Sequence, residues 1–279
     1  MTLSERNTFF KAGIAFCAVC TLLVTAASII SMPLYQGADL PEEITCRPSN
    51  IFNIITGMLL ENNFYAVNIS LLITVVFSLA SMILIHYFFE RTSAQEILYI
   101  AIFIISFSFE IIRFVLPLRE VYGFPSVYML FAARILLFIR YFGIFSLFAA
   151  SVCSAGLEVQ KIRNVIFVMI VAALIITFGV PIDVLSWDTS LNIVNGYGNM
   201  FRLVEVVVFF TTFISFLITA KNKDSKEYIY VAIGVIIALL GRSILLHTDN
   251  WIGPFPGIFL LSFGIWVLCS KLHKINLWL

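Results

Sequence analysis

Seven charged residues interrupt stretches of the chain that are otherwise apolar. Two are glutamates and five are arginines: Glu110, Arg113, Arg134, Arg140, Arg202, Glu205 and Arg242. Guanidinium groups bind carboxylates and phosphates through paired hydrogen bonds, and two carboxylates cannot balance five guanidiniums. Because adding Asp183 at the end of a neighbouring apolar stretch still leaves two positive charges over, these residue types favour an anionic occupant.

The apolar stretches that carry these charges are long enough to cross a bilayer, which takes about 20 residues in a helix. The chain has 279 residues, of which 61% are hydrophobic and 12% are charged, whereas soluble domains are about 25% charged. We therefore predict an all-α integral membrane protein, an eight-transmembrane-helix bundle that forms one polytopic domain over 1–279. The predicted spans are 10–32, 65–89, 97–118, 127–151, 163–182, 200–220, 228–248 and 252–271.

The distribution of basic residues between the spans predicts the orientation. Cytoplasmic loops are enriched in Lys and Arg, and one set of helix ends holds Arg6, Lys11, Arg91, Lys161, Arg163, Lys221, Lys223, Lys226, Lys271 and Lys274. The other set holds only Arg47 and Arg119. Both termini are therefore expected in the cytoplasm. The outer segment 33–64 contains a short apolar run near 51–59, which we expect to form an interfacial helix.

The depth of the charges follows from a rise of about 1.5 Å per helical residue. Six of them fall within roughly 5–12 Å of the outer boundary, and only Arg140 is expected deeper, near the middle. Glu110 and Arg113 share a helix face, as do Arg202 and Glu205, because residues three apart are neighbours on a helix. The predicted site is an outward-facing polar cup for an anionic small molecule or lipid headgroup, formed by Glu110, Arg113, Arg134, Arg202, Glu205 and Arg242. The alternative is that the same charges only form structural salt bridges between helices.

Other kinds of chemistry find little support in the residue pattern. There is no phosphate-binding glycine loop, no zinc-type Cys/His spacing and no basic footprint for nucleic acid, so we expect no cofactor and no metal. The order of Cys153, Asn199, Arg202 and His247 resembles that of exosortases and archaeosortases. In those enzymes, the resemblance implies, the three catalytic groups gather on the outer face. Here the predicted topology puts Cys153 on the cytoplasmic side, which disfavours an enzyme.

Three short motifs resemble the multi-span membrane sensor modules, with seven or eight helices, of bacterial signalling receptors. They are "RYFGIFSLFAASVCSAGLEVQK" (140–161), "PID" (181–183) and "GRSILL" (241–246). The resemblance implies a sensory module that passes its state to a separate cytoplasmic or membrane partner. We therefore expect a receptor-like or accessory binding protein of the bacterial inner membrane. A transporter of a small organic anion and a structural subunit of a membrane complex are the alternatives.

Overall fold

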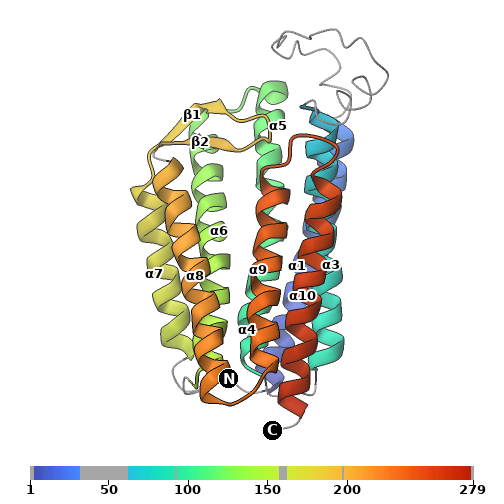
Figure 1. The fold of residues 1–279 in the computed structure, drawn as a ribbon. Helices are drawn as coiled ribbons and strands as arrows, with labels where there is room; N and C mark the ends of the chain where they lie inside the picture. Colours follow the sequence, from blue (N-terminus) through green and yellow to red (C-terminus); the bar gives the residue numbers. More distant parts are fainter. Residues whose placement is uncertain are drawn as a thin grey trace, which may run out of the picture.

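The structure is a computed structural model that describes residues 3–31, 62–90, 92, 94–156, 162–196 and 198–277. In this part of the chain, long helices form an upright bundle with a two-stranded hairpin at one end (Figure 1). The elements are α1 (Leu3–Ser31), α3 (Phe64–Phe89), α4 (Glu96–Ser108), the 3-10 helix η2 (Phe109–Phe114), α5 (Val115–Tyr122), α6 (Ser126–Ser154), α7 (Ile162–Gly179), β1 (Ile182–Trp187), β2 (Ile193–Asn195), α8 (Gly198–Asn222), α9 (Glu227–Leu246) and α10 (Pro254–Leu277). The predicted interfacial helix near 51–59 lies outside the described residues.

In the described residues, seven helical segments are long and apolar enough to cross a membrane: α1, α3, the continuous segment that starts with α4, α6, α8, α9 and α10. Helix α7, the predicted fifth span, is apolar but shorter than these seven. The outward faces carry large exposed apolar side chains such as Leu22, Phe178, Phe259 and Trp266. An apolar surface of this extent is unfavourable in water and suits hydrocarbon. These are the features of a multi-pass membrane protein.

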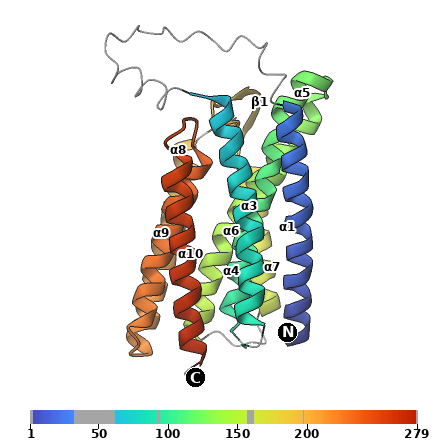
Figure 2. The same ribbon diagram turned by 90° about the vertical axis from the view of Figure 1, so that its right-hand side faces the viewer.

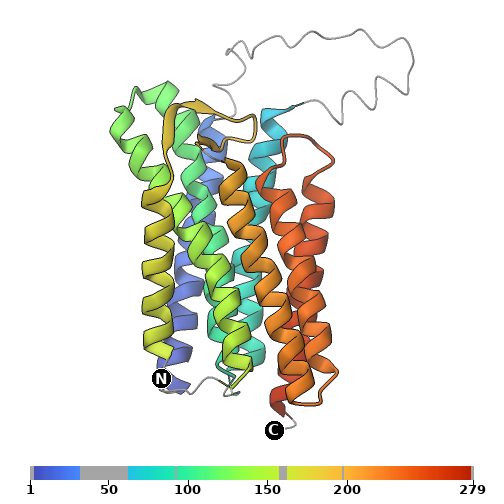
Figure 3. The ribbon, with the colours of Figure 1, turned by 60° about the vertical axis from the view of Figure 1, so that its left-hand side comes forward.

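Six helices form a closed ring in which each packs against the next, in the order α9, α10, α3, α4, α6 and α8, with α8 returning to α9. Helix α1 packs outside this ring against α3 and α4, as Figure 2 shows, and α7 packs outside it against α6 (Figure 3). Helix α1 begins and α10 ends at the same end of the bundle, opposite the hairpin (Figure 1). The helices alternate in direction along the bundle, which brings these two ends together.

The third predicted span is longer than the sequence indicated. Helix α4 continues through the 3-10 turn η2 into α5, which ends at Tyr122 instead of residue 118. Gly123 then adopts a left-handed conformation with φ 63°, and its N–H bonds to the carbonyl of Arg119. Glycine terminates helices in this way because it has no Cβ to clash there. In η2, residues three apart are eclipsed, so Glu110 and Arg113 point to the same side.

The segment after α7, which lies between two of the predicted spans, forms an antiparallel hairpin. Strand β1 pairs with β2, with Ile182 opposite Asn195 and Trp187 opposite Ile193. The turn between the strands reaches into the bundle: Ser190 and Leu191 are buried, and Leu191 packs in a cluster with Phe114 and Met129. The hairpin thereby brings polar atoms into contact with the buried charges.

Helices α9 and α10 pack closely because glycines lie at their contact. A Cβ added to Gly241 would lie 2.8 Å from the carbonyl oxygen of Gly257, and one added to Gly264 would lie 2.8 Å from the Cα of Ala238. Small residues permit this approach of two backbones, which is a common basis of helix association in membranes. The α9–α10 pair is therefore a rigid unit of the ring.

Polar contacts fasten the helices at the end of the bundle opposite the hairpin. Arg6 on α1 is buried and donates to the carbonyl of Phe89 at the end of α3 (2.6 Å). Glu227 at the start of α9 pairs with two lysines of α10, Lys271 at 3.0 Å and Lys274 at 2.6 Å. The first contact satisfies a carbonyl that the helix end leaves free.

Candidate functional site

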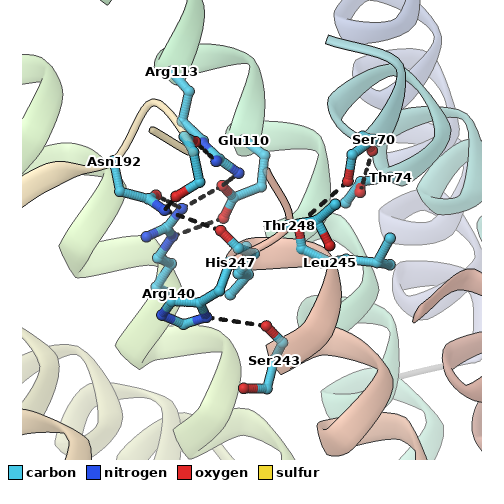
Figure 4. Close-up of polar contacts among 12 residues, drawn as sticks. Ser70, Thr74, Glu110, Arg113, Arg140, Asn192, Ser243, Leu245, His247 and Thr248 are labelled. Atoms are coloured by element: carbon cyan, nitrogen blue, oxygen red, sulfur yellow. Dashed lines mark hydrogen bonds and ion pairs between the residues drawn. The ribbon is translucent and has the colours of Figure 1, made fainter. Parts of the chain in front are cut away.

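A cluster of three charged side chains lies inside the bundle near the hairpin (Figure 4). Glu110 Oε1 accepts a hydrogen bond from Arg140 Nε (2.8 Å), and Oε2 accepts one from Arg140 Nη2 (2.6 Å). Arg113 Nη1 lies 3.6 Å from the same Oε2. Glu110 and Arg113 are each 2% exposed. One carboxylate therefore holds two guanidiniums, and the cluster keeps one positive charge.

The hairpin turn supplies polar partners to this cluster. Arg113 Nη2 donates to the carbonyl oxygen of Ser190, and Arg140 Nη2 donates to Asn192 Oδ1 (2.8 Å). Asn192 Nδ2 donates in turn to the carbonyl oxygen of Leu246 at the end of α9 (2.9 Å). Asn192 thus links α6 to α9, and the hairpin holds both arginines in place (Figure 4).

Arg242 on α9 differs from Arg113 and Arg140, which both pair with Glu110. Its side chain is buried, with 3% of the residue exposed. Its Nη2 donates to the carbonyl oxygen of Arg140 across 3.5 Å, a long hydrogen bond. Among the described residues, no carboxylate lies within 4.0 Å of the guanidinium. A buried charge without a counter-ion is costly, so this position calls for an anion.

A cavity of about 560 Å³ lies between α6, α8 and α9, and Arg242 lines it. Its wall near the hairpin is also lined by polar side chains from α6, the hairpin and α8: Arg140, Asn192, Arg202 and Glu205. Cavities of about 300–1,000 Å³ are typical of small-molecule sites. The three arginines on its wall face two carboxylates, Glu205 and the exposed Asp188. On the cavity wall, the three arginines therefore outnumber the two carboxylates.

The part of the cavity farther from the hairpin is apolar. It is lined by Val206, Phe209, Phe210 and Phe213 of α8, and by Ile236, Leu239 and Leu240 of α9. Along both α8 and α9 the lining changes from charged to apolar with distance from the hairpin. The cavity is therefore amphipathic.

The structure brings most of the predicted site residues together. Glu110 and Arg113 lie in the buried cluster behind the cavity, while Arg202, Glu205 and Arg242 line the cavity itself. Arg134 lies apart: its guanidinium donates to the carbonyl oxygens of Thr177 and Val180, at and beyond the end of α7 (2.7 Å for Val180). Arg134 therefore satisfies the end of a helix, and it is not among the residues that line the cavity.

Arg140 belongs to this cluster although the site predicted from the sequence did not include it. We expected it deeper than the other charges, whereas it contacts Glu110 directly and lines the cavity. Glu110 lies twelve residues before the end of α5, and Arg140 lies fourteen residues after the start of α6. The difference of two residues amounts to about 3 Å along a helix, so both lie at one level. The nearly equal distances of Glu110 and Arg140 from the two helix ends that flank the turn at 123–125 were the signal that could have found this pair.

The arrangement gives no support to the exosortase-like order. Cys153 is buried at the end of α6 that lies far from the hairpin, whereas Arg202 and His247 lie near it. In the described part of the chain, no group of three or more His, Cys, Asp or Glu side chains is placed to hold a metal ion. The site is thus defined by charge and shape: a helical membrane-type bundle with an amphipathic, arginine-lined cavity between three helices.

Comparison with known proteins adds no family to this description. No family model, no curated protein and no solved structure matches the chain. The interpretation of the site therefore rests on its own geometry.

Proposed function

We propose that the chain is a receptor-like or accessory binding protein that binds an anionic molecule or lipid headgroup in the cavity between α6, α8 and α9. The observation that carries the proposal is Arg242, a buried guanidinium on the cavity wall without a carboxylate partner among the described residues. A bound carboxylate or phosphate would provide the missing counter-charge through short, charge-assisted hydrogen bonds. Arg202, exposed on the opposite wall, would contact the same anion.

In this proposal all eight apolar helices, α7 included, cross the bacterial inner membrane, and the hairpin faces outward. The basic residues at the opposite end support this orientation, because cytoplasmic ends are enriched in Lys and Arg. Those described there are Arg6, Lys11, Arg163, Lys221, Lys223, Lys226, Lys271 and Lys274. The termini would then be cytoplasmic, and occupancy of the cavity would be passed to a separate partner at that side.

A binding protein fits the cavity better than a transporter does. A transported anion needs polar groups along its whole route, but the far end of this cavity is lined by Phe209, Phe213 and Leu239. Uptake of labelled organic anions by proteoliposomes would test the transporter alternative directly. We expect uptake no faster than through protein-free vesicles.

Native mass spectrometry of the protein purified under mild detergent conditions tests the proposal. We expect an anionic molecule bound to the wild type and to the control Arg163→Gln, and strongly reduced occupancy in Arg242→Gln. Arg163 is a suitable control because it is exposed at the opposite end of the bundle and its substitution removes the same charge. If folded Arg242→Gln protein carries the same adducts as the wild type, Arg242 does not bind the anion and the proposal fails.

A further inference from the structure

We propose that the ligand of this cavity is an anionic amphiphile with a single hydrocarbon chain, and that it enters sideways from the bilayer between α8 and α9. The inference rests on the proposed function and specifies its ligand class. It follows from how charge, apolar surface and exposure are distributed around the cavity.

The first observation is the change of lining along the two helices. On α8, Arg202 and Glu205 give way to Phe209 and Phe213, so the wall runs from charged to aromatic over eleven residues. That is about 16 Å of helix. On α9, Arg242 is followed toward the far end of the cavity by Leu239 and Ile236. The long axis of the cavity therefore has one charged end and one apolar end.

The second observation is that the cavity opens to the side. Val206 and Phe210 on α8 and Ile236 and Leu240 on α9 line the cavity and are also exposed on the surface. In Figure 1, α8 leans away from α9 toward the hairpin. The opening is thus bordered by apolar side chains at the level where a bilayer would be hydrocarbon. Nearer the hairpin it is bordered by the exposed Arg202, Ser243 and His247.

Neither a small inorganic anion nor a purely apolar molecule suits both the charged part and the apolar part of the cavity. An inorganic anion would pair with Arg242 but leave the aromatic part of a 560 Å³ cavity without contacts. A neutral hydrocarbon would fill that part but leave the guanidinium unpaired. A carboxylate or phosphate head with one alkyl chain satisfies both, with the head at Arg202 and Arg242 and the chain along Phe209 and Phe213. Such a molecule in the outer half of a bilayer already has its head at the surface and its chain in the hydrocarbon.

Photolabelling in phosphatidylcholine nanodiscs tests the proposal. The probe is a long-chain fatty acid with a diazirine in mid-chain, and its methyl ester is the uncharged control. We expect the acid to label peptides covering 206–213 and 236–240, and the ester to label them at least about tenfold less, because a charge-assisted hydrogen bond is lost. Dodecanoate and dodecyl phosphate should compete, and the stronger competitor identifies the head group. Inorganic phosphate and acetate should not.

Two variants test the role of the charge and the path of entry separately. Arg242→Gln should reduce labelling about tenfold or more, while Arg163→Gln leaves it unchanged. Val206→Trp, which narrows the opening without touching a charge, should reduce labelling while the protein stays folded. It also keeps the test valid if Arg242→Gln does not fold.

The outcomes distinguish this inference from the proposed function. If inorganic phosphate or acetate binds in an Arg242-dependent way and the chain-bearing anions bind no better, the cavity binds a small anion. The proposed ligand class, an anionic amphiphile, is then wrong. Labelling spread over the outer faces of α1 and α3, with no dependence on Arg242 or on charge, would show that the cavity does not bind an anionic amphiphile. If no small anion shows Arg242-dependent binding either, the proposed function fails as well.

Discussion

Among the described residues, Glu110 is the one carboxylate that pairs with Arg113 and Arg140, so its neutralisation should destabilise the fold more than the loss of either arginine. Its two carboxylate oxygens accept from Arg140 at 2.8 and 2.6 Å, and Arg113 lies 3.6 Å away. Glu110→Gln keeps the shape but leaves two guanidiniums, one of them fully enclosed, without a counter-charge. Removal of one partner from a buried ion pair costs about 3–5 kcal/mol.

Arg140→Gln provides the matched comparison. It leaves Glu110 and Arg113 as a neutral pair and removes mainly the hydrogen bonds of Arg140 to Glu110 and Asn192. We expect a smaller loss of about 1–3 kcal/mol, which is the cost of unsatisfied buried hydrogen-bonding groups. The difference between the two variants therefore measures the charge balance of the cluster and not its hydrogen bonds alone.

Reversible unfolding in mixed micelles, titrated with sodium dodecyl sulfate and followed by far-ultraviolet circular dichroism, gives both free energies. Arg163→Gln, at an exposed position, should stay within about 0.5 kcal/mol of the wild type. The reasoning is refuted if Glu110→Gln is no less stable than Arg140→Gln, because the carboxylate would then not be the limiting charge.

Three further substitutions test other parts of the structure. Asn192→Ala should speed hydrogen exchange of the β1–β2 amides, because it removes the links from the hairpin to Arg140 and to the end of α9; unchanged exchange would contradict this. Gly264→Ala should cost about 1–3 kcal/mol by forcing α9 and α10 apart, measured by the same unfolding titration, whereas Gly179→Ala, with nothing within 4 Å of the added Cβ, should not. Glu227→Gln removes two partly exposed ion pairs and should change the free energy of unfolding by about 1 kcal/mol or less; a larger loss would show that this contact is not solvated.

The helical architecture could be predicted from composition because apolar runs of about 20 residues allow little else in a membrane. The helix ends were harder to predict. The charged pair Arg119 and Glu120 looked like the end of the third span, but the helix continues until Gly123. This error of four residues misplaced Glu110, whose depth was counted from residue 118. Counted from Tyr122, Glu110 lies about 6 Å deeper, at the level of Arg140.

The partners of the arginines could not be predicted from single helices. Arg134 binds carbonyls near the end of α7, and Arg113 binds the carbonyl of Ser190, so backbone groups compete with carboxylates for buried guanidiniums. The polar segment that holds Ser190 and Asn192 gave no sign that it would turn into the bundle. Its strand-forming residues, such as Ile182 and Val184, could have indicated a hairpin, but not the direction of its turn.

Each arginine therefore has to be assigned separately to a structural or a ligand-binding role. Arg113, Arg134 and Arg140 have carboxylate or carbonyl partners within the bundle, and these contacts satisfy their guanidiniums without a ligand. Glu110 is already shared by two of them and cannot also serve Arg242. Glu205, across the cavity on α8, makes no ion pair within 4.0 Å among the described residues. Closing the cavity would bring this carboxylate toward Arg242, whereas an anionic ligand would supply the charge with the cavity open. If the cavity binds an anion as proposed, the same unpaired guanidinium would couple ligand binding to the separation of α8 from α9.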